Sequence, residues 1–211
     1  MAVSVSPSQS NKSIKQAPAP PEPVLRFSVE QYHEMIRASI LTADDQVELL
    51  EGWLLYKTPK NPPHRIATKL IQQAFERVII PNWPGWYVDT QEPITVEDSE
   101  PEPDVAVIRG ETRDYADRHP GAADIALLVE VAEATLERDR KLKKRLYARA
   151  GIPAYWIVNL AERKIETYSQ PVAGGREPAY ANRLDYDSAD SIPLIIEGRE
   201  IARFAVNDLL P

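Results

Sequence analysis

One apolar run decides the fold: Ile125-Ala126-Leu127-Leu128-Val129-Glu130-Val131-Ala132. It has the length and composition of a buried strand, yet it contains Glu130. A buried carboxylate loses its water, which costs on the order of several kcal/mol unless a partner or a metal compensates. The same anomaly occurs upstream, at Asp104 in Pro103-Asp104-Val105-Ala106-Val107-Ile108. Both acids are therefore candidates for chemistry.

The segment after this run is predicted to be a helix from Leu136 to Ala150, ended by Gly151. At about 100° per residue its apolar side chains share one arc; they are Leu142, Leu146, Tyr147 and Ala150. Asp139 and Lys143 fall inside that arc. Three acids and one lysine are thus directed at the protein interior.

Composition sets broad limits. The chain has 211 residues, enough for one domain with a substantial core, and we expect a disordered tail over 1–24 and a single domain over 25–211. No stretch approaches a membrane span, so no membrane partner is expected. The absence of cysteine excludes disulfides and thiolate chemistry and suits the reducing cytoplasm. The histidines, at 33, 64 and 119, lack the short spacing of a zinc site, so a metal should be held mainly by oxygen.

Local signals predict two helices and a hairpin before the buried strands. Ser28 and Gln31 form a capping box for a helix to about Ile40, whose apolar residues keep a helical spacing. A hairpin follows over 47–57, turning at Glu51-Gly52. Asn61 caps a second helix that runs through Ile80. Its predicted buried side comprises Ile66, Leu70, Ile71, Ala74, Phe75 and Val78.

Strands are predicted over 86–90, 104–108, 125–132, 154–159 and 164–169, with a final hairpin over 192–204. Two apolar strands followed by a helix and another strand indicate an α/β fold built on one sheet. We expect a restriction-endonuclease-like mixed sheet flanked by helices.

Two buried carboxylates on neighbouring strands suit Mg²⁺, which takes oxygen ligands and keeps several waters. Without a cation, Asp104 and Glu130 would repel each other. Lys143 is the candidate for neutralising charge on a scissile phosphate. Asp139 and Lys143 could instead form a plain i,i+4 ion pair, which for those two residues alone is the better explanation. Taken with Asp104 and Glu130, the functional interpretation is favoured.

The net charge of −7 argues against broad attraction to nucleic acid. A local basic surface remains, because the segment 138–149 has seven basic residues and one acid. This segment could contact a phosphate backbone or could simply be a solvated helix face.

Several motifs in order carry a family resemblance: Glu48-Leu49-Leu50-Glu51-Gly52, Pro62-Pro63-His64, Pro103-Asp104-Val105, Val129-Glu130-Val131, then Asp139, Lys143 and Tyr147 at steps of four, then Ala150 to Val158. From about Phe27 onward the chain resembles the Uma family, described as "putative restriction endonucleases", a branch of the PD-(D/E)XK nuclease superfamily. The resemblance implies that Asp104 and Glu130 bind metal and that Glu48 is a further acid of the site.

The chain departs from the family pattern twice. Ala132 stands where many superfamily members carry lysine, so the lysine role passes to Lys143, as the family pattern suggests. The stretch Ala132-Glu133-Ala134-Thr135 lacks the Ser-Pro often seen after this strand. His64 matches a family histidine, although a capping or packing role is the simpler one. Gln91 could orient a phosphate or a water, or be a polar residue at the edge of the core.

The sequence thus predicts a Mg²⁺-dependent endonuclease, with Mn²⁺ able to substitute, that hydrolyses DNA, and by analogy a homodimer. Asp104 and Glu130 would bind the metal, Glu48 would assist, Lys143 would stabilise charge and Asp139 would position it. A noncatalytic binding or scaffold protein is the alternative. A purely structural oligomer is a third, and it would need arginine or backbone donors to satisfy the acids.

Overall fold

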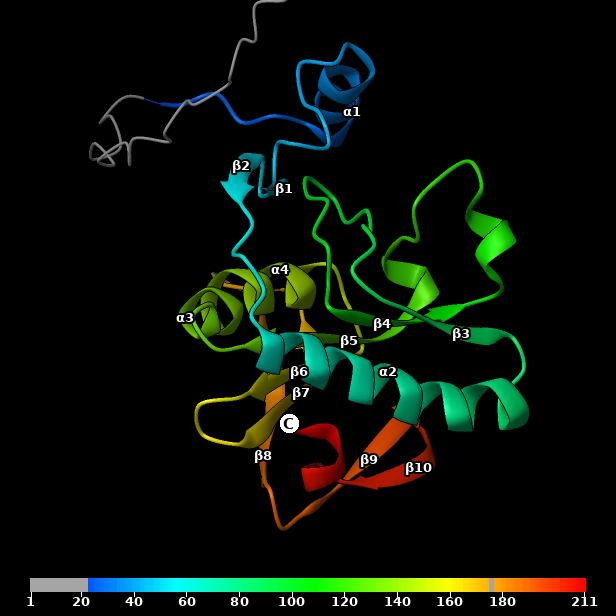
Figure 1. The fold of residues 1–211 in the computed structure, drawn as a ribbon. Helices are drawn as coiled ribbons and strands as arrows, with labels where there is room; N and C mark the ends of the chain where they lie inside the picture. The colour runs from blue at the N-terminus through cyan, green and yellow to red at the C-terminus, as the bar shows by residue number, and fades with distance from the viewer. Residues whose placement is uncertain (1–22, 175–176) are drawn as a thin grey trace, which may run out of the picture.

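The computed structural model describes residues 23–174 and 177–211. Its centre is a six-stranded mixed sheet in the order β3-β4-β5-β6-β7-β8 (Figure 1). The strands are β3 (Trp86–Asp89), β4 (Val105–Arg109), β5 (Ile125–Ala132), β6 (Ala154–Asn159), β7 (Lys164–Val172) and β8 (Ala179–Asp187). Only β5 and β6 pair in parallel. The predicted mixed α/β fold is confirmed.

The sheet separates two hydrophobic layers. Along β5, Leu127, Val129 and Val131 belong to one cluster, whereas Leu128 and Ala132 belong to the other. This alternation is what a pleated strand requires. Glu130 is in step with Leu128 and Ala132, so its side chain is on their face of the sheet.

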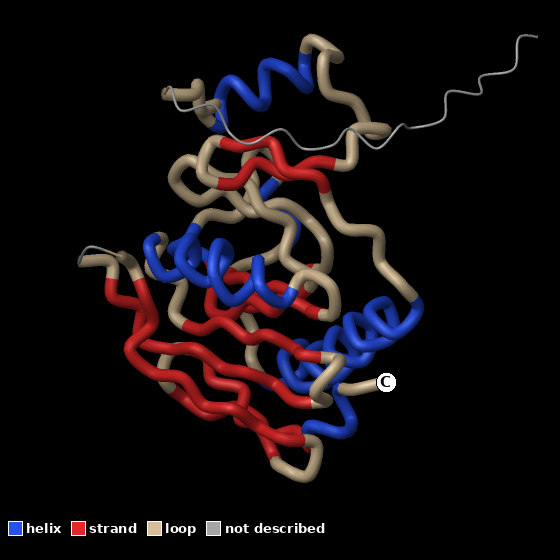
Figure 2. Tube along the Cα trace, turned by 90° about the vertical axis from the view of Figure 1, so that its left-hand side faces the viewer, coloured by secondary structure: helices blue, strands red, loops and turns tan. Residues whose placement is uncertain are grey.

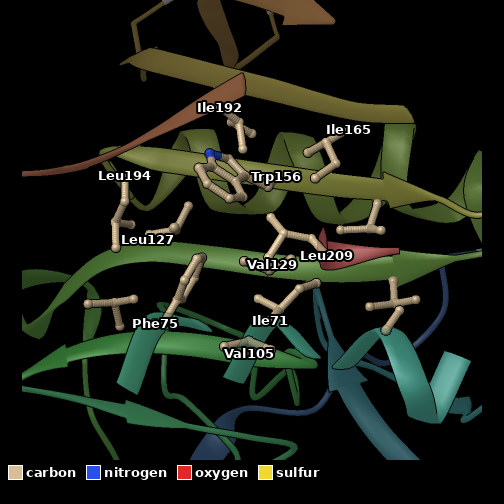
Figure 3. Close-up of a cluster of buried hydrophobic side chains, with 14 of the residues drawn as sticks. Ile71, Phe75, Val105, Leu127, Val129, Trp156, Ile165, Ile192, Leu194 and Leu209 are labelled. Atoms are coloured by element: carbon tan, nitrogen blue, oxygen red, sulfur yellow. The ribbon is translucent and has the colours of Figure 1, made fainter. Parts of the chain in front are cut away.

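The helix α2 (Pro62–Asn82) covers the first face. Ala67, Ile71, Phe75 and Ile79 recur every four residues and are inaccessible to solvent. Figure 3 shows Ile71 and Phe75 directed at the sheet strands that carry Val105, Leu127 and Val129. The hairpin β9 (Ser191–Ile196) and β10 (Arg199–Ala205) and the 3₁₀ turn η4 (Val206–Leu209) complete this layer.

The opposite face is covered by the helical segment after β5. It begins as α3 (Leu136–Arg138), continues through a π-helical turn η3 (Asp139–Lys143) and ends as α4 (Lys144–Arg149). The prediction of one regular α-helix is therefore corrected. Short π-helical segments are frequent at functional sites.

A small group of elements lies at the end of the molecule opposite β9 and β10 (Figures 1 and 2). It contains α1 (Val29–Arg37) and the predicted hairpin, β1 (Val47–Leu50) and β2 (Trp53–Tyr56). The hairpin turns at Glu51 and Gly52, both of positive φ. A Cβ on Gly52 would lie 2.6 Å from Arg26 Cβ, so glycine is required there.

Several predicted boundaries and faces are wrong. The first helix ends at Arg37, because Ser39 is left-handed, and Ile36 and Ile40 are exposed. The second helix continues through Pro81, which takes a place in its last turn, and Ile66 is exposed. The strand β8 was missed because its residues are mostly exposed and show no apolar alternation.

The predicted disordered tail over 1–24 lies outside the described residues, except for its last two. The single domain over 25–211 stays a prediction. Within the described ranges, no helix is long and apolar enough to cross a membrane.

Candidate active site

Asp104, the residue before β4, faces Glu130 of β5, the strand that pairs antiparallel with β4. The register pairs Val105 with Val129, and one further step brings Asp104 opposite Glu130 on the face covered by η3. Directly opposed side chains have Cβ atoms about 5 Å apart. Both residues are buried. The apolar residues next to Asp104 and Glu130 in the sequence form the two strands, β4 and β5, whose pairing brings the acids together.

The two carboxylates open into one cavity of about 90 Å³, which we call the acidic cavity. Its ionisable lining residues are Glu48, Lys57, Lys60, His64, Glu102, Asp104, Glu130, Glu133, Arg138 and Lys143. A water needs about 10–15 Å³ of such space, so the cavity has room for a cation with several waters.

Asp104 is held by three donors. His64 Nε2 lies 3.0 Å from Asp104 Oδ2, and Lys60 Nζ lies 3.3 Å from Oδ1. The Val131 amide donates a 2.9 Å hydrogen bond to Oδ2. Burial opposes ionisation of Asp104, but the hydrogen bond and charge of His64, with Lys60 and Val131, keep the pKa of Asp104 below its ordinary value. These contacts therefore favour the ionised form of Asp104.

Glu130 has a different environment. Lys143 Nζ and the Tyr147 hydroxyl each donate a 2.8 Å hydrogen bond to Glu130 Oε1. Burial raises the pKa of Glu130 to about 8 despite the opposing charge of Lys143. The nearby carboxylates of Asp139, Asp104 and Glu48 raise it further. Without a cation, Glu130 therefore holds a proton more readily than a free carboxyl does.

Lys143 lies between two acids, because its Nζ is also 3.4 Å from Glu48 Oε2. Burial lowers the pKa of Lys143, but the carboxylates of Glu130, Glu48 and Asp139 outweigh it and raise the pKa above its ordinary value. The ammonium is consequently retained at neutral pH. It is a source of positive charge and not a general base.

Asp139 is buried, as predicted, but among the described residues it makes no ion pair with Lys143. Its Oδ2 accepts a 2.6 Å hydrogen bond from the Thr135 hydroxyl. The Asp139 carbonyl accepts from the Lys144 amide, a π-helical bond, and from the Tyr155 hydroxyl at 3.3 Å. Asp139 is thus the first residue of the π-helical turn that ends at Lys143, and the plain i,i+4 ion pair is not formed among the described residues.

Of the remaining predicted site residues, two line the acidic cavity and one does not. Glu48, from β1, and His64, from the first turn of α2, both line the acidic cavity. The His64 amide donates to the capping Asn61 side chain, while its ring Nδ1 is buried and finds no hydrogen-bond partner in the part of the chain that the structure describes. Gln91 is exposed, has a left-handed backbone and does not line the cavity.

Lys60 and Tyr147 are contacts that sequence reasoning missed. Lys60 lies in the loop after β2 and carries no local pattern. Tyr147 was placed on the apolar arc, and the contact of its hydroxyl with Glu130 was not predicted.

The basic face predicted for 138–149 is largely neutralised. Arg145 and Arg149 pair with Glu51, and Arg140 pairs with the buried Glu166. Of the seven basic residues, six have a carboxylate partner within the described chain, Lys144 being the exception. This favours the solvated-face interpretation over a phosphate-binding helix.

The donors of the acidic cavity suit a hard cation, because they are carboxylates with room for water. The carboxylate oxygens do not converge on a single point, because each carboxylate is bound by its own donors. His64 and Lys60 contact Asp104, and Lys143 and Tyr147 donate to Glu130. The residues therefore fit a cation by donor chemistry and by available space.

The sheet, its flanking helices and its buried acids define a restriction-endonuclease-like α/β protein. A crystal structure described as "a putative nuclease belonging to DUF820" from Anabaena variabilis ATCC 29413 has the same fold, with a TM-score of 0.67 at 14% identity. The match covers 87% of this chain and 97% of that one. Residues 29–202 match the family model Uma2, "Putative restriction endonuclease". The chain belongs to the Uma2 family, which confirms the resemblance; no curated protein matches it.

Proposed function

We propose that this protein is a Mg²⁺-dependent endonuclease that hydrolyses phosphodiester bonds in DNA, with Mn²⁺ able to replace Mg²⁺. The observation that carries the proposal is the opposition of Asp104 and Glu130, buried on adjacent strands at one cavity. Proteins place two acids in this way only at a cost in desolvation, which a bound cation offsets. Membership of the Uma2 family supports the same activity.

Asp104 and Glu130 would hold the ion, and Glu48 would be a ligand or would orient a water. A bound Mg²⁺ lowers the pKa of a coordinated water and stabilises the leaving oxygen. His64 keeps Asp104 anionic and directs its carboxylate, since His64 Nε2 contacts Asp104 Oδ2. These three acids and one histidine come from β1, from α2, from the residue before β4 and from β5, so the complete fold is needed to assemble them.

Hydrolysis adds one water to the phosphodiester: its oxygen bonds to phosphorus, one ester P–O bond breaks, and a proton ends on the leaving oxygen. Negative charge grows on the phosphate oxygens in the transition state. Lys143 keeps its ammonium charge and would stabilise that negative charge. Asp139 acts through the π-helical turn that directs Lys143.

The substrate would meet the mouth of the acidic cavity and not the outer face of α4. Lys57, Lys60 and Arg138 line the cavity, and the Lys60 side chain is 37% exposed. Cations at this rim can contact phosphates on either side of the scissile bond. The homodimer, in which each subunit cuts one strand, rests on analogy alone. A cytoplasmic location is supported by the absence of cysteine.

One feature favours a noncatalytic binding or scaffold role. Asp104 and Glu130 already have protein donors, including the backbone amide of Val131, so the fold does not require a metal to satisfy them. Such a protein would fold normally and show no stabilisation by divalent ions.

A crystal soaked in Mn²⁺ separates the two roles. The endonuclease proposal expects an anomalous peak about 2.0–2.2 Å from carboxylate oxygens of both Asp104 and Glu130. Unchanged contacts of Glu130 with Lys143 and Tyr147, with no peak in the cavity, would favour the noncatalytic role.

A further inference from the structure

A second group of metal-binding side chains lies outside the acidic cavity. His33, Glu100 and His119 each place a ligand atom within 4.8 Å of the other two. They come from α1, from the segment before β4 and from the connector before β5, respectively. The hollow lined by His33 and His119 shares no lining residue with the acidic cavity.

We propose that His33, Glu100 and His119 bind a borderline divalent transition-metal ion, of which Zn²⁺ is the type. Two imidazoles and one carboxylate are a ligand set for Zn²⁺ and its neighbours, whereas Mg²⁺ prefers oxygen alone. The expectation from sequence that a metal should be held mainly by oxygen is therefore revised for this part of the molecule.

The distances from Glu100 to each histidine are close to those between two ligands of a tetrahedral site, and all three ligand atoms lie within 4.8 Å of one another. Ligands at 2.0–2.1 Å from Zn²⁺ are about 3.3 Å from one another. His119 Nε2 lies 3.6 Å from Glu100 Oε1, longer than a good hydrogen bond. His33 Nε2 lies 2.9 Å from Oε1 and 2.8 Å from Oε2. A small opening of the His33 contact, about 0.5 Å, would therefore bring the His33–Glu100 pair to the spacing of two metal ligands.

The surroundings support a held carboxylate and an open fourth position. The Glu100 side chain is 3% exposed, and Thr95 Oγ1 donates a 3.2 Å hydrogen bond to its Oε2. Such an outer hydrogen bond orients a ligating carboxylate. The side chains of His33 and His119 are 32% and 41% exposed. Three protein ligands plus one water from the hollow would complete four-coordination.

The ion would fasten α1 to the rest of the fold. Tyr32 is the only buried residue of α1, and its apolar Ile36 is exposed. The Glu100 amide also donates a 2.7 Å hydrogen bond to the Leu49 carbonyl, next to Glu48. A metal at Glu100 thus stabilises the segments on which Glu48 and Asp104 are carried.

The chain has three histidines, so imidazole NMR tests the proposal on the wild-type protein without any substitution. Titration with Zn²⁺ should shift the ring-nitrogen signals of His33 and His119 together, at one equivalent. Mg²⁺ in excess should leave those two signals in place. If Zn²⁺ leaves the signals of both rings unchanged, His33 and His119 make only imidazole–carboxylate contacts with Glu100, and the proposal is wrong.

Variants assign the site and separate it from the acidic cavity. His33→Gln and His119→Gln should each weaken Zn²⁺ binding at least tenfold by calorimetry. The doubly changed His64→Gln, Asp104→Asn protein should still bind one Zn²⁺ with wild-type affinity. Loss of all Zn²⁺ binding in that double variant would assign the ion to the acidic cavity and overturn the proposal. All of these measurements report Zn²⁺ binding and do not depend on nuclease activity.

Discussion

Lys143 Nζ donates a 2.8 Å hydrogen bond to Glu130 Oε1, and both side chains are buried beneath a π-helical turn. Removing one partner of a buried ion pair leaves the other uncompensated. The contact explains how the protein tolerates Glu130 without a metal. It also places the Lys143 ammonium where its positive charge would stabilise the negative charge of a bound phosphate.

Replacing Lys143 by methionine keeps the length and apolar packing of the stem and removes the charge. Without the ammonium, Glu130 should stay protonated to a higher pH, so the metal-free variant should lose stability mainly above about pH 8, where Glu130 ionises in the wild type, and Mg²⁺ should restore part of it. Loss of one electrostatic donor, about 3 kcal/mol, should slow cleavage roughly a hundredfold. The measurements are chemical denaturation and DNA nicking.

Lys144→Met is the matched control for that substitution. Lys144 is half-buried and lies 5.2 Å from the centre of the Tyr168 ring, outside the acidic cavity. Its loss should leave cleavage within about twofold of wild type, because Lys144 does not line the acidic cavity. Equal activity of wild type and Lys143→Met would return Lys143 to a purely structural role.

Tyr147→Phe removes one hydroxyl from Glu130 and no packing. A hydrogen bond to a charged group contributes about 1.5–3 kcal/mol, so the free energy of unfolding should fall by about that amount near pH 8. Tyr180→Phe is the control, since the Tyr180 hydroxyl is buried and has no hydrogen-bond partner among residues 23–174 and 177–211. It should be neutral or stabilising. Equal losses in the two variants would show that the Glu130 contact is energetically silent.

The raised pKa of Glu130 predicts a pH dependence. Between its ordinary value of 4.5 and about 8, the folded metal-free state binds more protons than the unfolded state. The free energy of unfolding should therefore fall as pH rises through that window. The raised pKa of Asp139 acts in the same direction. Stabilisation by Mg²⁺ should grow over the same range, because the cation replaces the proton.

Denaturant titrations in EDTA from about pH 5 to 8 measure this slope. Glu130→Gln should flatten it and abolish the Mg²⁺ effect, whereas Glu133→Gln, an exposed residue at the cavity, should behave as wild type. A slope that is the same with and without Glu130 would refute the proposed proton exchange.

The hairpin that supplies Glu48 depends on Gly52. Gly52→Ala should cost more than about 1–2 kcal/mol, because φ is +78° and the added Cβ would lie 2.6 Å from Arg26 Cβ. Gly85 has φ +87°, but nothing lies within 4 Å of the point that a Cβ would occupy there, so Gly85→Ala isolates the backbone strain. Thermal denaturation should rank Gly52→Ala below Gly85→Ala. The reverse order would remove the steric argument.

Much of the candidate site could be predicted, because four of its charged residues occupy positions that the apolar pattern marks as buried. Asp104 and Glu130 stand out within apolar strands, and helical spacing alone places Asp139 and Lys143 inward. The contacts between distant segments could not be predicted. His33 and Glu100 are 67 residues apart, and no local spacing indicates that they meet. The π-helical turn was hidden for a similar reason, since its sequence fits a regular α-helix equally well.

The most direct test is nicking of supercoiled plasmid by wild type and Asp104→Asn, each with EDTA, Mg²⁺ or Mn²⁺. Asparagine retains an oxygen for the Val131 amide, so the variant should fold while losing the anion that binds the metal. The account predicts nicking by wild type only with a divalent ion, and a loss of at least a hundredfold in Asp104→Asn together with the loss of Mg²⁺ stabilisation. Metal-independent nicking, or equal nicking by the two proteins, would contradict it.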